Sequence, residues 1–139
     1  MRTLIAFSKD QSGGAAVEMA IVAPVIAGLA LVSAEVWMMS MDKQRAATAL
    51  GAASDYYMGG GLSDDDAASV AMAAWRDPPQ GAAVSHARSG RCGADLAEVS
   101  SFCSNGSAAA VYVTLIASGV SQGLFDERNV EAERTVRVR

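Results

Sequence analysis

The sequence is poor in the residues that build catalytic and metal sites. Its 139 residues contain one histidine, His86, and two cysteines, Cys92 and Cys103. A structural zinc site takes four such ligands, and the chain has neither a zinc-ligand cluster nor a glycine-rich phosphate loop. A dyad of His86 with either cysteine is conceivable, but an exposed strand histidine accounts for His86 better. The sequence therefore predicts no enzyme, no cofactor and no metal.

Basic residues are also scarce. Eleven lysines and arginines face fifteen aspartates and glutamates, which gives a formal net charge of −4. No basic stripe is present to neutralise phosphates, so we expect no nucleic-acid partner. Aromatic residues make up 6% of the chain, and much of its apolar half is alanine. These proportions predict a small core rather than a deep one.

Against these shortages stands one long apolar run. Residues 19–34 contain no charge, and the run continues past Glu35 to residue 41. As a helix, residues 19–41 would measure about 35 Å, against about 30 Å for the hydrocarbon of a bilayer. Arg2 and Lys9 precede the run, and such positive charges favour a cytoplasmic amino terminus. The sequence thus predicts one membrane span, with the remainder of the chain outside the cytoplasm.

A glutamate, Glu18, lies at the head of this run, directly after the small residues GGAAV of positions 13–17. Spanning a bilayer requires no such charge, and a charge in hydrocarbon is costly, so Glu18 suggests a function. Pro24 follows inside the run and removes one helix hydrogen bond, which predicts a kink. A tolerated proline and a glutamate that reaches to the headgroups are the alternatives for these two residues.

The stretch 14–24, GAAVEMAIVAP, resembles the TadE-like family of minor pilins or pseudopilins of the tight-adherence (Flp-type) pilus system. The resemblance covers roughly residues 10–58. It implies that residues 1–13 are a cytoplasmic leader, which a prepilin peptidase removes between Gly13 and Gly14. Glu18 then becomes the fifth mature residue, whereas a cut after Gly14 would make it the fourth. Met19 stands where many Flp major subunits have tyrosine, which favours an assembly pseudopilin.

The resemblance also implies partners and location. The protein would be a single-pass inner-membrane protein with a periplasmic carboxyl-terminal domain, and it could enter the surface pilus. Its partners would be the prepilin peptidase, other minor and major pilins, the inner-membrane assembly platform and the lipid bilayer. It would pack with other pilins to prime or cap the fibre. In that setting Glu18 would pair with the amino terminus of a neighbouring subunit.

Three other interpretations remain at this level. Residues 32–34, VSA, form an acceptable signal-peptidase site before Glu35, so the run could be a cleaved secretory signal. The protein could instead be a membrane-tethered or secreted periplasmic binding module without a pilus role. A small anchored enzyme is the third interpretation, and the missing catalytic residues disfavour it.

The fold expected is α+β and pilin-like. One helix over residues 14–58 spans the membrane, continues into the periplasmic domain of residues 59–139, and ends at the glycines of positions 59–61. Ser63 is expected to cap a second helix, which Asp77 and two prolines terminate. Because calcium loops alternate their ligands, the aspartates at 64–66 indicate a capped first turn rather than a cation site.

Three strands are expected after the second helix. Residues 83–91 form a weak strand, residues 111–116 a strong β-branched one, and residues 135–139 alternate cleanly. Gly119, Gly123 and Asn129 are assigned to the connection between the last two. The strands would form a short antiparallel sheet over the second half of the long helix.

The two cysteines lie eleven positions apart. Outward topology would put them in an oxidising compartment, where a disulfide between Cys92 and Cys103 is the expected state. Closing so short a loop contributes about 3 kcal/mol in the chain-entropy estimate. Free thiols or a redox pair are the alternatives, although a redox pair usually shows C-x-x-C spacing.

Overall fold

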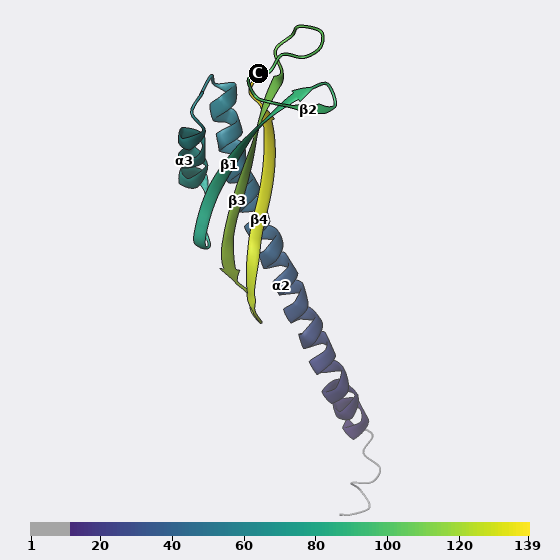
Figure 1. The fold of residues 1–139 in the computed structure, drawn as a ribbon. Helices are drawn as coiled ribbons and strands as arrows, with labels where there is room; N and C mark the ends of the chain where they lie inside the picture. The colour runs from purple at the N-terminus through teal and green to yellow at the C-terminus, as the bar shows by residue number, and fades with distance from the viewer. Residues whose placement is uncertain (1–11) are drawn as a thin grey trace, which may run out of the picture. The chain divides into compact units, whose positions relative to one another are not determined.

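The computed structural model describes residues 12–139, so the predicted leader lies outside the described residues except for its last two positions. Over this range the chain is α+β, as expected, and Figure 1 shows its elements. In chain order these are α2 (Ser12–Met58), α3 (Asp64–Ala74), β1 (Gln80–Cys92), β2 (Asp95–Ala97), β3 (Ala110–Gln122) and β4 (Glu127–Arg137).

The described chain divides after Trp37 into two units, and α2 runs through the point of division. The first unit is the apolar part of α2, and the second is Met38–Arg139. Helix α2 begins at Ser12, two residues before the predicted start. Glycine disfavours a helix by about 1 kcal/mol per residue but permits its dihedral angles, so Gly13 and Gly14 join the first turn.

Helix α2 ends at Met58, as predicted. Gly60 has a φ of 91°, a left-handed conformation that glycine adopts without strain. The Gly60 N–H donates to the Tyr57 carbonyl and the Gly61 N–H to the Tyr56 carbonyl, both over 3.0 Å. This pair of bonds is a Schellman motif, which satisfies carbonyls at the helix end and reverses the chain.

Helix α3 is capped as the sequence predicts. The Ser63 hydroxyl accepts a hydrogen bond from the Asp66 N–H at 3.2 Å. The helix ends at Ala74, three residues before Asp77, which has a φ of 49°. Trp75, the residue after the last turn, is 4% exposed and packs into the core.

Within the described residues one sheet forms, with strand order β2-β1-β3-β4 and antiparallel pairing throughout. The three-residue strand β2 was not predicted; it pairs with the end of β1, where Gly90 lies opposite Ala97. Tyr112 of β3 lies opposite Ser89 of β1 and Arg137 of β4, which fixes the register at one end.

Strands β3 and β4 are longer than predicted, and the assignment of Gly119 and Asn129 to their connection was wrong. Gly119 pairs with Val130, and Asn129 pairs with Val120, so both residues lie inside the sheet. A Cβ on Gly119 would lie 2.6 Å from the Pro79 side chain. The glycine is therefore required for packing rather than for a turn. Only residues 123–126 remain as the connection between β3 and β4.

The core of the second unit lies between α2, α3 and the sheet. Alternate residues of β3 point inward, among them Val113 and Leu115, which are fully buried with Leu50 of α2. Most other core residues are alanines, as the composition predicts. Small side chains let helix and sheet approach closely, but they bury little apolar area, so each larger residue matters more.

Candidate functional site: an exposed apolar helix

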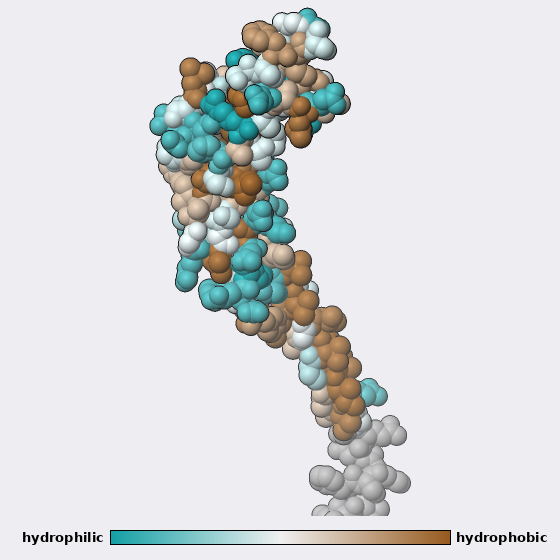
Figure 2. Space-filling view, in the orientation of Figure 1, coloured by the Kyte–Doolittle hydropathy of each residue, from teal (hydrophilic) through white to brown (hydrophobic). Residues whose placement is uncertain are grey.

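Large apolar side chains cover the first half of α2, and they are exposed (Figure 2). Met19 is 64% exposed and Leu29 is 65% exposed. The others with at least 40% exposure are Val17, Ile21, Val22, Val25, Ile26, Leu31, Val32, Val36, Trp37 and Met39. At about 100° per residue these large side chains spread over roughly two thirds of the helix surface. Alanines, among them Ala20, Ala23, Ala27 and Ala30, lie on the remaining face, so every side is apolar. A helix that is apolar on all sides is suited to lipid or to a protein interior.

The helix is long and apolar enough to cross a membrane over part of Ala16–Met58. None of its most apolar 18-residue window is buried among the described residues, unlike the core helix of a soluble protein. Glu18 is exposed on this segment, and so is Gly14, with open space around the position of an added Cβ. Pro24 lies inside α2, and the helix continues on both sides. The predicted kink stays a prediction.

A polar cluster begins the second unit. The Ser121 hydroxyl donates a 2.6 Å hydrogen bond to Asp42 of α2, although 79 residues separate them. The guanidinium groups of Arg45 and Arg128 each lie 3.8 Å from the same carboxylate. This cluster ties α2, directly after the apolar stretch, to the end of β3. These contacts link the sheet to this part of the helix.

A second polar cluster joins α2, α3 and β1. The Arg88 guanidinium binds Asp64 through Nε at 2.6 Å and Nη2 at 2.8 Å, and the Tyr57 hydroxyl donates to Asp64 at 2.7 Å. The hydrogen bonds from Arg88 have the largest effect, and together with the one from Tyr57 they hold the pKa of Asp64 below its usual value. Burial and the neighbouring Asp64 raise the pKa of Tyr57 well above its usual value. Asp64 is therefore a structural anion, not a proton donor.

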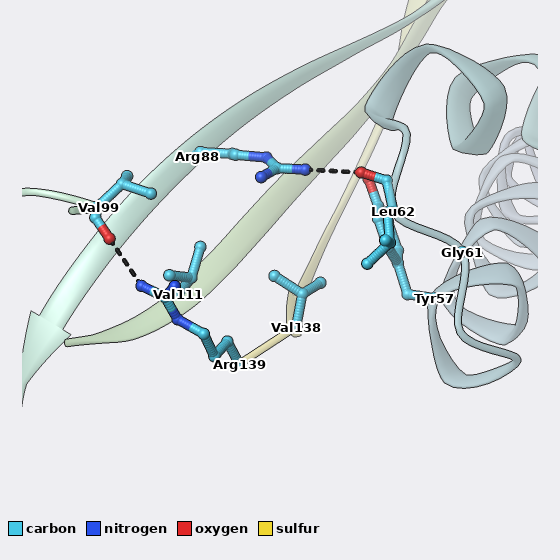
Figure 3. Close-up of a pocket in the computed structure, with 8 residues that line it drawn as sticks. All are labelled: Tyr57, Gly61, Leu62, Arg88, Val99, Val111, Val138 and Arg139. Atoms are coloured by element: carbon cyan, nitrogen blue, oxygen red, sulfur yellow. Dashed lines mark hydrogen bonds between the residues drawn. The ribbon is translucent and has the colours of Figure 1, made fainter. Parts of the chain in front are cut away.

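The cavity beside this cluster, about 380 Å³, is lined by Tyr57, Leu62, Arg88 and the carboxyl-terminal residues Val138 and Arg139, among others (Figure 3). Its polar groups are already engaged. Arg88 also donates to the Leu62 carbonyl at 3.0 Å, and Arg139 to the Val99 carbonyl at 3.0 Å. The cavity thus has a partly hydrophobic wall, and its lining residues do not include a nucleophile in contact with a general base.

The remaining residues singled out by the sequence lie apart from that cavity. Cys92 and Cys103 form the predicted disulfide. His86 is exposed on β1, where its Nε2 lies 4.0 Å from Asp65. Within residues 12–139 no three histidine, cysteine, aspartate or glutamate side chains gather in a way that could hold a metal ion.

The role of Asp64 and Arg88 was missed in the sequence. The aspartates at 64–66 indicate a capped helix, which is correct, but nothing marks Asp64 as different from Asp65. Its partner Arg88 is 24 positions away. Only the packing of α3 against β1 brings the two together.

Comparison with protein-family models, curated proteins and solved structures gives no match for this chain.

Proposed function

We propose that this chain is a single-pass membrane protein whose α2 crosses the bilayer over residues 19–41. The exposed apolar half of α2 supports this proposal, because roughly 25 cal/mol per Å² favours removing such surface from water. A polar cluster around Asp42 follows the apolar stretch directly, where the headgroup region would begin. Trp37, 64% exposed, suits the same interface.

More particularly, we propose that it is a minor pilin or pseudopilin of a tight-adherence pilus, which packs with other pilins to prime or cap the fibre. One observation carries the proposal: an apolar helix headed by Gly13, Gly14 and Glu18 continues without a break into a helix covered by a small antiparallel sheet. The amino-terminal half would serve membrane retention and subunit packing, and the second unit would lie in the periplasm.

The proposed cut between Gly13 and Gly14 falls in the first turn of α2. A protease needs an extended substrate, so this turn must unwind before cleavage. Terminal turns open at little free-energy cost, and glycine has the least helical preference of the non-proline residues. The diglycine therefore favours access by a prepilin peptidase. A cut there would free an amino group four residues from Glu18.

The charge of Glu18 fits a role in packing. Its side chain is exposed on the apolar part of the helix, where lipid would surround it in an isolated subunit. A charge in that environment seeks a partner, and the amino group of a neighbouring mature subunit is a suitable one. Such a pair would fix the axial register between subunits.

The disulfide supports the outward topology. Cys92 and Cys103 lie in the second unit, and such bonds persist in the periplasm but are rare in the cytoplasm. The positive charges of Arg2 and Lys9 favour the same orientation, with the amino terminus inside.

Processing in the native host is the test. Intact mass and amino-terminal sequencing of the membrane-bound protein should give Gly14 as the first residue. Gly13→Leu should leave the precursor uncut, because a bulky residue fits poorly before the scissile bond. Gly28→Leu is the matched control: it changes an open helical position inside the apolar segment and should leave cleavage normal.

A mature start at Glu35 would mean cleavage by signal peptidase and would overturn the proposal. The alternative function, a tethered or secreted periplasmic binding module, predicts either that start or an uncut chain. It also predicts no co-purification with other pilins. A polar cavity beside the disulfide is the feature that favours a binding role in the second unit.

A further inference from the structure

The face of the sheet turned away from α2 carries an arginine pair at one end. Arg137 of β4 lies directly opposite Tyr112 of β3, and Arg91 of β1 lies opposite Ala110. Successive residues of a strand point to opposite faces, and Val111 and Val113 are buried toward α2. Tyr112 and both arginines therefore share the outer face. The Arg91 guanidinium carbon lies 5.9 Å from the centre of the Tyr112 ring.

These three side chains line a cavity of about 420 Å³, and the disulfide loop supplies the rest of its wall. This volume lies within the range of small-ligand sites. The loop contributes the polar side chains of Ser104, Asn105 and Ser107. Its apolar lining consists of two alanines, the disulfide and the Tyr112 ring, and the Arg91 guanidinium already lies over that ring, so little apolar surface is open to a large apolar side chain.

The loop is held in place before any ligand binds. The Cys103 N–H donates to the Ser107 carbonyl at 2.8 Å, and the Gly106 N–H donates to the Cys103 carbonyl at 2.8 Å. The Asn105 side-chain oxygen accepts from the Ser107 N–H at 3.0 Å and from its hydroxyl at 2.7 Å. The disulfide anchors this turn to β1. Preorganisation of this kind lowers the entropy cost of binding.

No side-chain carboxylate of the described residues pairs with either arginine. In residues 12–139 no side-chain carboxylate lies within 4.0 Å of Arg91 or Arg137, whereas Arg45, Arg88 and Arg128 each have an aspartate partner. Arg137 donates through Nε to the main-chain oxygen of Arg139 at 3.1 Å, and its terminal nitrogens make no hydrogen bond within that range. In a chain of net charge −4, this is a local site for an anion.

We propose that this cavity binds a carboxylate-bearing sugar residue of an acidic polysaccharide. Arg91 and Arg137 hold the carboxylate, and the hydroxyl and amide groups of the loop bind the ring hydroxyls. The mostly polar wall favours a hydroxylated ligand over a peptide, which would need apolar anchors. This inference rests on the second unit alone and does not depend on a pilus role.

Calorimetric titration of the full chain in uncharged detergent micelles tests the proposal. The probes are trigalacturonate, a neutral trisaccharide of the same size, triglutamate and inorganic sulfate. Trigalacturonate should bind at millimolar or lower concentration, and the other three should bind at least about tenfold more weakly. Arg91→Gln and Arg137→Gln should each weaken binding of trigalacturonate by about tenfold or more, because a charge-assisted hydrogen bond is lost.

Arg76→Gln is the matched control: it removes the same charge from an exposed arginine beside a different cavity, near Asp77, and should leave the affinity within about twofold. Circular dichroism of all three variants checks that each is folded. Several results would overturn the proposal. They are absence of trigalacturonate binding, equal binding of triglutamate, sulfate or the neutral sugar, and an equal loss of affinity in Arg76→Gln.

Discussion

Arg88 of β1 and Asp64 of α3 form a two-point contact, with Nε 2.6 Å from Oδ2 and Nη2 2.8 Å from Oδ1. The Asp64 side chain is only 13% exposed, and Tyr57 at the end of α2 donates to the same carboxylate. One carboxylate thus links a strand and two helices in a domain whose core is mostly alanine.

Asp64→Asn should lower the free energy of unfolding by about 1–3 kcal/mol, since it leaves Arg88 without its ionic partner. Thermal unfolding of the full chain in detergent micelles measures the change. Asp65→Asn is the control: that side chain is 95% exposed and lies 4.0 Å from His86. It should change stability by about 0.5 kcal/mol or less. Equal losses in the two variants would contradict the role given to Asp64.

Acid should weaken the same contact. The pKa of Asp64 is lower in the folded protein than its ordinary value of 3.8. Its stabilising contribution is therefore complete above that value and is lost as the pH falls through the lower, folded pKa. Other carboxylates titrate in this range too, so the test is the difference between wild type and Asp64→Asn. That difference should shrink below about pH 4.

Alkali should act through Tyr57. Its pKa is raised above the ordinary value of 10.0, so the folded state keeps the phenol protonated while the unfolded state ionises. Stability should therefore fall as the pH rises above about 10. Tyr57→Phe loses the hydrogen bond to Asp64 and starts from a lower melting temperature at pH 7. Its decline between pH 9 and 11 should nevertheless be the shallower of the two, and parallel curves would refute the assignment.

Two further stability changes, at glycines, should have opposite signs. A Cβ on Gly90 would lie 2.7 Å from the carbonyl oxygens of Ala97 and Glu98, so Gly90→Ala must displace the backbone of β2. A cost of about 1–3 kcal/mol is expected. Gly51→Ala adds a Cβ 3.9 Å from the Arg134 side chain, an ordinary contact inside a helix. It should stabilise by about 0.5–1 kcal/mol, and chemical denaturation compares the two.

Glu18→Gln should separate folding from assembly. The residue lies outside the second unit, so melting of that unit and membrane levels should be unchanged. In the proposed pilin role assembly should suffer, because there the substitution leaves a neighbour's amino group without its counter-charge, at a cost of several kcal/mol. Co-purification with other pilins and surface pilus counts are the measurements.

The comparison for Glu18 is Asp55→Asn, which removes an exposed charge from the second half of α2. Normal assembly in both variants would show that Glu18 is a tolerated interfacial charge. Loss of assembly in both would indicate a general effect of helix charge rather than a specific pair.

Several features depend on residues that are close together in the sequence, so they could be predicted from the sequence alone. The end of α2 needs a residue that tolerates positive φ, and three glycines stand there; the start of α3 needs a hydroxyl, and Ser63 stands there. The long apolar run was equally clear, since no charged residue interrupts positions 19–34. The disulfide was expected from two cysteines separated by a short loop, together with the outward topology that the apolar run and the basic residues before it predict.

Tertiary structure alone decided the extent of the sheet and the polar contacts. Glycine is typical of turns, yet Gly119 lies inside a strand. Glycine is needed at this position because the side chain of Pro79, forty positions earlier, packs where a Cβ would be. Asp64 gains its partner only when α3 lies against β1, and the arginine pair gathers only because β1 and β4 flank β3. Caps, runs and short loops depend on neighbours along the chain. Ion pairs, close backbone approaches and cavities depend on residues that the fold brings together.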